Sequence, residues 1–288
     1  MSKVLFKSRE NRMKPIVSVI CTVKNGEKFI SQTIDSILDQ TLSELELIIV
    51  DDGSSDGTSE IIKEYTKYDS RIKFVPTKGV GRARALNLAI KEAQGKYIAN
   101  IDADDPCHPQ RLEIEAKLLD SNREFALIAT DTILIKDYVH YKELNWVVEY
   151  FPQNSTIIDV TRKLLKFNPI SHSSIMIRKN ALLQVGGYNE NLKSNVDYDL
   201  WVRLASSKYK LGKIPLKLSS KRIHSAQSFE NKKRIDYIIN SSRVQIKAIK
   251  KLNAPIYYFI FPYIRLLYGL LPQSLRVNIR WISKKLNL

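Results

Sequence analysis

The chain has 288 residues, of which 44% are hydrophobic, so it is long enough for one large α/β domain with an appendage and too short for two full enzymes. Ten glycines and ten prolines exclude a collagen-like or low-complexity chain. The formal net charge of +16 lies mainly at the ends, because residues 231–288 hold 12 Lys and Arg against one acid and residues 1–14 hold five against one. The nearly neutral body argues against nucleic-acid binding as the main function.

The two cysteines, Cys21 and Cys107, form neither a CxxC pair nor a zinc-binding spacing. We expect both to be reduced thiols of a cytosolic protein. The first 14 residues contain no apolar stretch of the kind that a signal peptide carries, so we expect no such leader.

Apolar spacing predicts strands that alternate with helices from residue 15 onward. In chain order we expect a strand at 17–21, a helix at 27–38, a strand at 45–50, a helix capped by Asp56 or Thr58 and ending near residue 68, a strand at 72–75, a helix at 81–93, a strand at 97–101, a helix at 109–119 and a strand at 125–129. Beyond about residue 160 the alternation stops, and a further helix is expected at 196–205.

This alternation predicts an α/β fold whose mostly parallel, doubly wound sheet is flanked by helices. We divide the chain into a basic N-terminal extension at 1–14, a main domain at 15–228 and a basic amphipathic helical tail at 229–288. Within the main domain, we distinguish a first half at 15–105 from a second half at 106–228.

Acidic side chains follow two of the predicted strands, where ligands of such sheets bind. Asp102 and Asp104 come directly after the strand at 97–101, and carboxylates two residues apart suit Mn²⁺ or Mg²⁺, which prefer oxygen ligands. Asp51 and Asp52 follow the strand at 45–50, where a carboxylate can accept hydrogen bonds from a nucleobase or a ribose. The alternatives are a solvated acidic turn for the first pair and a turn with a helix cap for the second.

The segment GVGRARALN at 79–87 adds a glycine-rich entry to a helix. Its backbone N–H groups, together with Arg82 or Arg84, are suited to bind phosphate. The spacing matches neither G-x-G-x-x-G nor a Walker motif, so dinucleotide binding and a P-loop are not expected.

Three segments resemble family 2 glycosyltransferases of the GT-A fold, of the type that builds bacterial surface polysaccharides. They are VSVICTVKNGEKFISQTIDSILDQTLSELELIIVDDGSSDGT, GVGRARALNLAIKEAQGKYIANIDADD and NPISHSSIMIRKNALLQVGGYNENLKSNVDYDLWVRLA. The resemblance covers roughly residues 15–228. It implies that residues 15–105 are the nucleotide-sugar-binding half and residues 106–228 the acceptor-side half of a GT-A glycosyltransferase domain. It implies a nucleotide-sugar donor and a Mn²⁺ or Mg²⁺ cofactor. We expect the donor to be a UDP-sugar, and donors with thymine or guanine as the base remain alternatives.

The resemblance also assigns roles to single residues. It implies that Asp52, with Asp51 in reserve, contacts the nucleobase, that Asp102 lies near the ribose and the metal, and that Asp104 binds the metal. Asp197, which stands before Leu200 and Trp201 in the third segment, is implied as the general base. Thr22 and Asn25 are expected at the base pocket. Arg84 is expected at the phosphates, and His224 at the diphosphate or the metal.

Two positions depart from the family's pattern. Val196 stands where many members have Glu before the base, and Leu86 stands where many have Arg before Asn87. No Gln-x-x-Arg-Trp motif is present, which argues against a processive synthase. His172 is left with two interpretations, a ligand contact and a packing residue, and Asp199 remains an alternative to Asp197.

The expected function is that of an inverting, metal-dependent glycosyltransferase that moves a sugar to a hydroxyl of a glycan or lipid-linked acceptor. One alternative is a membrane-associated scaffold that binds nucleotide sugars without catalysis. Another is a nucleotidyltransferase, although residues 17–27 lack the glycine- and lysine-rich triphosphate loop that it needs.

The tail contains an apolar, aromatic stretch at 254–272 between basic flanks. Pro255, Pro262 and Arg265 interrupt it, so it is too broken for a membrane span of about 20 apolar residues. It suits a position on an anionic membrane surface, which predicts a cytoplasmic enzyme peripheral to the inner face of the cell membrane. The alternatives are a helical pair packed on the domain and a homodimer interface.

Overall fold

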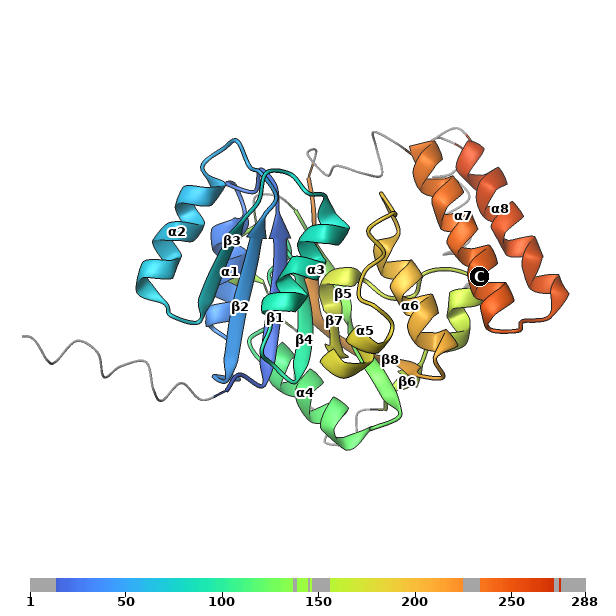
Figure 1. The fold of residues 1–288 in the computed structure, drawn as a ribbon, viewed down its shortest axis with the longest axis horizontal. Coiled ribbons are helices and arrows are strands. Elements are labelled where there is room, and N and C mark those ends of the chain that lie inside the picture. The colour runs from blue at the N-terminus through green and yellow to red at the C-terminus, as the bar shows by residue number, and fades with distance from the viewer. Residues whose placement is uncertain are drawn as a thin grey trace, which may run out of the picture.

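The computed structural model describes residues 14–136, 139–144, 146, 156–224, 234–271 and 275. Its centre is a mixed sheet with the strand order β3-β2-β1-β4-β7-β5-β8-β6 (Figure 1). The strands are β1 (Val17–Val23), β2 (Leu45–Asp51), β3 (Ile72–Pro76), β4 (Tyr97–Asp102), β5 (Phe125–Lys136), β6 (Ile158–Asp159), β7 (Ile175–Arg178) and β8 (Lys210–Ile223).

Helices cover both faces of this sheet (Figure 1). They are α1 (Ile30–Leu38), α2 (Thr58–Tyr68), α3 (Arg82–Glu92), α4 (Arg111–Ser121), α5 (Lys179–Gln184), α6 (Val196–Ser206), α7 (Arg234–Lys251) and α8 (Ile260–Leu270). Short 3-10 turns connect them: η1 (Tyr141–Glu143), η2 (Thr161–Leu165), η3 (His172–Ser174) and η4 (Ile256–Phe259).

The first four strands run parallel, as the alternation predicts. Their register places Thr22 of β1 beside Asp102 of β4, and Val23 of β1 beside Asp51 of β2. The acidic ends of β2 and β4 therefore lie on either side of β1, at one edge of the sheet. The predicted fold class, a mostly parallel α/β sheet flanked by helices, is confirmed.

Side chains that alternate along the strands build one core on each face. Ile20 and Ile48 point to the face covered by α3, α5 and α6, where Trp201 is fully buried. Val19 and Ile49 point to the face covered by α1, α2 and α4. Strands that are buried on both faces need nearly continuous apolar runs, which explains why they stand out in the sequence.

The second half of the sheet departs from the predicted pattern. β7 runs antiparallel between β4 and β5, and β8 then pairs parallel to β5. β5 continues to Lys136, well beyond the predicted end at residue 129. β6, β7 and β8 were not predicted; in β8, Gly212 and Pro215 interrupt an alternation of apolar and basic residues. At the start of α2 the N-cap residue is Gly57, although the Asp56 carboxylate accepts a hydrogen bond from the Thr58 N–H.

The described part of the tail, residues 234–271, contains two neighbouring helices at the end of the molecule farthest from α2 (Figure 1). α7 packs on α6 and η2, and α8 packs on α7. Among the residues that the structure describes, no helix is long and apolar enough to cross a bilayer. The N-terminal extension lies outside the described residues except for Lys14, and so do residues 276–288.

Candidate active site

Asp102 at the end of β4 is held by a cation from α3. The Arg82 Nη2 atom donates to Asp102 Oδ1 at 2.6 Å, and about half of the Arg82 side chain is exposed. Arg82 is the first residue of α3, and the chain enters this helix through Gly81, whose φ of +90° favours glycine. Burial is the largest single effect and opposes ionisation of Asp102, but Arg82, His172 and Lys221 together outweigh it, so the pKa of Asp102 lies well below its ordinary value.

Asp104 is met by a side chain from the far half of the chain. His224, just beyond β8, lies with its Nε2 atom 2.9 Å from Asp104 Oδ2, and its ring packs 4.9 Å from that of Phe29. The neighbouring Arg222 is fully buried and donates through Nε to the Asp104 carbonyl oxygen at 3.0 Å. The end of β8 therefore supports the loop that follows β4.

Asp105 is a structural member of the same acidic loop. Its carboxylate is 5% exposed and accepts hydrogen bonds from the Arg222 N–H and the Ser173 hydroxyl, both at 2.8 Å. Burial, followed by the charges of Asp104 and Asp102, raises the pKa of Asp105 well above its ordinary value. Asp105 is thus occupied in joining β4, β8 and η3.

His172 joins several of these groups beneath the surface. Its Nδ1 atom lies 3.1 Å from Arg82 Nη2 and 3.0 Å from Asn100 Nδ2, and its Nε2 atom lies 2.7 Å from Tyr188 Oη. Guanidinium and amide N–H groups can only donate, so Nδ1 accepts and Nε2 carries the proton that is donated to Tyr188. The ring is 8% exposed. His172 therefore orients Arg82 from below.

Asp51 and Asp52 hold the loops around the sheet edge. Asp51 is buried and accepts from the Ser54 N–H at 2.9 Å and from the Ser59 hydroxyl. Asp52 accepts from the backbone N–H of Val80 at 2.6 Å. Its second carboxylate oxygen accepts from the Gly81 N–H at 3.0 Å.

The other predicted donor contacts lie at the same edge. Asn25 has a φ of +56° and accepts from the Ser55 N–H at 2.8 Å, so it braces the loop after β2. Thr22 is half-buried at the end of β1. Arg84 is exposed on α3, whereas the cation that reaches the β4 carboxylate is Arg82.

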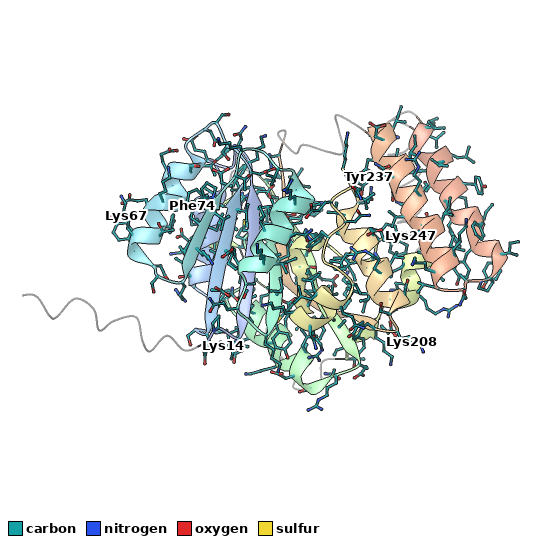
Figure 2. All side chains as sticks on the ribbon, viewed as in Figure 1. Lys14, Lys67, Phe74, Lys208, Tyr237 and Lys247 are labelled. Carbon is teal, nitrogen blue, oxygen red and sulfur yellow. The ribbon has the colours of Figure 1, made fainter. Side chains whose placement is uncertain are left out.

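Two aspartates in the first turn of α6 have different surroundings. Asp197 is half-buried, and its Oδ2 atom accepts from Asn168 Nδ2 at 2.8 Å. Asp199 is 1% exposed and is bonded to Arg203 Nε at 2.8 Å and to Lys247 Nζ. Lys247 comes from α7 (Figure 2), so Asp199 fastens the tail to the domain.

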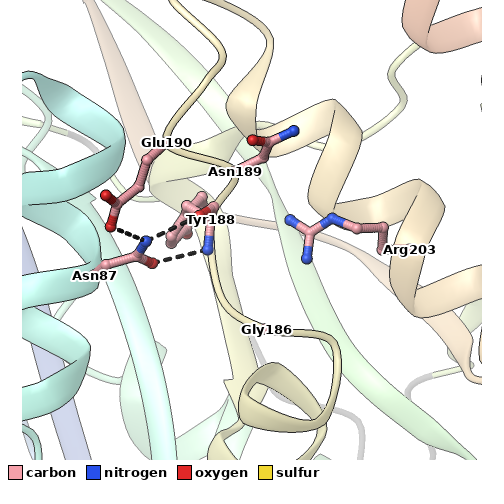
Figure 3. A pocket seen from close by; sticks show the side chains of 6 residues that line it. All are labelled: Asn87, Gly186, Tyr188, Asn189, Glu190 and Arg203. Atoms are coloured by element: carbon pink, nitrogen blue, oxygen red, sulfur yellow. Dashed lines mark hydrogen bonds between the residues drawn. The ribbon is translucent and has the colours of Figure 1, made fainter.

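A pocket of about 410 Å³ opens on the flank between α3 and α6 (Figure 3). Asn87 clamps its wall by bonding both the N–H and the carbonyl oxygen of Tyr188, at 2.8 and 2.9 Å. The pocket is lined by Asn87, Gly186, Tyr188, Asn189, Glu190 and Arg203, none of which was a predicted site residue.

The residues fit a divalent metal in part. Among the described residues, no group of three or more His, Cys, Asp or Glu side chains is clustered to hold a metal. The carboxylate of Asp104 and the imidazole of His224 lie next to each other, while Asp102 is held by Arg82. Mg²⁺ sites often use one or two carboxylates and take their other ligands from substrate phosphates and water. Asp104 can supply such a carboxylate, and the imidazole of His224 lies beside it.

Sequence comparison finds glycosyltransferases. An uncharacterized glycosyltransferase of Methanocaldococcus jannaschii is 34% identical over 200 residues, which cover 68% of this chain and 67% of the relative. The O-antigen biosynthesis glycosyltransferase WbnJ of Escherichia coli is 34% identical over 67% of this chain and 73% of WbnJ. An uncharacterized glycosyltransferase of Rickettsia bellii is 36% identical over 207 residues. The aligned residues make up 72% of this chain and 29% of that longer protein.

Solved structures share the fold. TarS of S. aureus, residues 1–349 in complex with UDP-GlcNAc, superposes with a TM-score of 0.63 at 20% identity, over 90% of this chain and 72% of that one. The mannosyltransferase PcManGT of Pyrobaculum calidifontis, in complex with GDP-Man and Mn²⁺, gives 0.65 at 18% identity, over 88% and 70%.

The family model described as glycosyl transferase family 2 matches residues 18–185, more than half of the chain. Two relatives are 34% identical over at least two thirds of both sequences, so sequence and fold agree. This chain belongs to glycosyl transferase family 2 and is a glycosyltransferase.

Proposed function

We propose that this enzyme transfers a sugar from a UDP-sugar to a hydroxyl of a glycan or lipid-linked acceptor, with inversion at the anomeric carbon. One observation carries the proposal. Arg82 is bonded to Asp102 of the acidic loop, and the charges of Asp102 first and Asp197 also raise the pKa of Arg82. Asp197 on α6 thus lies in electrostatic reach of the same cation as the acidic loop, which supports a base and a donor site on one surface.

In the proposed mechanism, Asp197 accepts the proton of the acceptor hydroxyl while that oxygen bonds to the anomeric carbon. The bond from this carbon to the nucleoside diphosphate breaks on the opposite side of the sugar, so a single displacement inverts the centre. Arg82 lies where it can balance negative charge on the departing diphosphate. Asn168, by donating to Asp197 Oδ2, fixes the carboxylate and leaves its other oxygen for the acceptor.

The metal proposed at Asp104 and His224 is Mn²⁺ or Mg²⁺, with Asp102 as a further ligand or a ribose contact. When bound, it would neutralise charge that develops on the leaving diphosphate. The Mn²⁺ in the complex of the mannosyltransferase neighbour supports this proposal. The adjacency of Asp104 and His224 supports it independently.

UDP is proposed as the nucleotide, with Asp52, Asp51, Thr22 and Asn25 around the base and Arg84 near the phosphates. The UDP-GlcNAc complex of TarS supports a UDP-sugar, whereas the mannosyltransferase complex with GDP-Man shows that the fold also accepts guanine. A polysaccharide acceptor is proposed, which the role of WbnJ in O-antigen biosynthesis supports.

The test is donor hydrolysis by the purified full chain over a panel of UDP-, dTDP- and GDP-sugars, with Mn²⁺, Mg²⁺ or EDTA. We expect release of one nucleoside diphosphate that EDTA stops and that Asp104→Ala abolishes. Calorimetry of nucleotide binding accompanies it, because transfer to water is slow in some transferases. A protein that neither hydrolyses a donor nor binds any nucleotide with Mn²⁺ would refute the proposal.

A further inference from the structure

The outermost helix of the tail exposes a continuous apolar stripe. Its most exposed members include Ile256 at 84%, Leu267 at 66% and Leu270 at 68%. Together with their neighbours they recur at helical spacing along one face of η4 and α8. The stripe consists of Ile256, Tyr257, Ile260, Tyr263, Ile264, Leu267 and Leu270.

The opposite face of α8 is the one that packs on the domain. Pro262 and Gly269 are buried, and a side chain at Gly269 would collide with Ile238 of α7 at 2.5 Å. Arg265 points the same way and donates to Gln245 Oε1 at 3.3 Å. Since these contacts fix how α8 is rotated, the apolar stripe faces away from the protein.

Basic side chains lie near the helix that carries the stripe. Lys250 and Lys251 are exposed at the end of α7, close in sequence to Ile256. On the neighbouring turn η2, the Lys166 Nζ atom lies 5.4 Å from the ring centroid of Phe261. After Asp236 the sequence contains no further acid to its end at residue 288. The surface combines apolar and aromatic side chains with unopposed positive charge.

We propose that this stripe is the membrane-docking face of the enzyme and that it binds an anionic lipid bilayer. Aliphatic side chains would enter the boundary between headgroups and acyl chains, and Tyr257 and Tyr263 would lie at headgroup level. Lys250, Lys251 and Lys166 would meet the lipid phosphates. A second copy of this chain fits less well, because it would bring the same positive charge to the contact.

The helix lies on the bilayer and does not cross it. α8 has 11 residues, whereas a span needs about 20. Lys247 of α7 is bonded to Asp199 of α6, so the docking face is tied to the helix that carries Asp197. Membrane binding would therefore hold the proposed base at a fixed height above the lipid surface.

The test is co-sedimentation of the full chain with phosphatidylcholine vesicles that contain or lack phosphatidylglycerol, at low and high salt. Wild type should bind the anionic vesicles, and salt should weaken binding. Ile260→Ser, Ile264→Ser and Leu267→Ser combined should lower the partition coefficient on the order of a hundredfold. Lys250→Gln with Lys251→Gln should lower it about thirtyfold.

Leu183→Ser combined with Tyr68→Ser is the matched control, because both side chains are exposed and lie on other surfaces. It should bind vesicles like wild type, and all variants should keep donor hydrolysis and the melting temperature. Wild type that ignores anionic vesicles would overturn the proposal. So would a stripe variant that binds vesicles normally but changes from dimer to monomer, since a second copy would then cover the stripe.

Discussion

Asp197 and Asp199 lie two residues apart on α6, and the structure predicts opposite consequences of neutralising them. In Asp197→Asn the new amide keeps an oxygen that can accept from Asn168 Nδ2, so the fold should be unaffected. Loss of the base should lower turnover about 10²–10⁴-fold. At about 1.36 kcal/mol per tenfold, this corresponds to about 2.7–5.4 kcal/mol in the barrier.

Asp199→Asn should act on stability. Asp199 is 1% exposed and is bonded to both Arg203 and Lys247, so its neutralisation leaves two cations without their carboxylate. Breaking a buried pair from one side costs about 3–5 kcal/mol. Because 35% of the Lys247 side chain is exposed to water, the lower end, about 3 kcal/mol, is expected. In a protein of this size it lowers the melting temperature by about 6–12 °C.

The two variants should be measured side by side, by calorimetric melting and by turnover per folded molecule with the donor found in the hydrolysis panel. We expect low turnover with a normal melting temperature for Asp197→Asn, and the reverse for Asp199→Asn. Near-normal turnover of Asp197→Asn would refute the assignment of the base. Lost turnover at an unchanged melting temperature in Asp199→Asn would transfer the role to Asp199.

Three further predictions concern other parts of the protein. Burial raises the pKa of Glu115 to about 8, although the charge of Arg111 opposes this shift. The free energy of unfolding should therefore fall by up to about 1.4 kcal/mol per pH unit between pH 4.5, the pKa in the unfolded chain, and pH 8. Urea unfolding of Glu115→Gln should lack this part of the pH dependence. Gly186→Ala should lower the free energy of unfolding by about 1–2 kcal/mol, because the φ of Gly186 is +80°. Gly187→Ala should lower it further in the same urea melts, because its new Cβ would also lie 2.7 Å from Asn87 Oδ1. Equal losses in the two variants would contradict the role of Asn87 as a clamp. His224→Ala should weaken Mn²⁺ binding about 10–100-fold in calorimetry. Leu134→Ala, a control at an exposed position of β5, should leave Mn²⁺ binding unchanged. If His224→Ala binds Mn²⁺ as tightly as wild type, His224 is not a ligand.

The first half of the fold was predictable because its strands are buried on both faces. Apolar runs such as the one that ends at Val50 cannot be read as amphipathic helices, and the acids that follow mark the strand ends. β7 and β8 escaped prediction for a different reason. β7 has four residues and is defined by pairing with strands far away in the chain, and β8 carries lysines on its less buried side.

The candidate site was predictable to the level of residue type. Arg82 and Arg84 both begin α3, but residues two apart point to different sides of a helix, so only the docking of α3 decides which one reaches Asp102. Asn100 and Tyr188, which bond His172, were missed. Asn100 gave a signal, since an amide within a buried strand requires a partner.

The position of β8 bears on how this enzyme can be divided or recombined. The segment that matches the family ends at residue 185, before α6 and before β8. Yet β8 lies inside the sheet next to β5, and its last residues supply Asp105 with the Arg222 N–H. A fragment that stops at residue 185 would leave a bare edge along β5 and a buried acid without its donor. Exchange of segments between relatives should therefore leave β8 with the sheet that it completes.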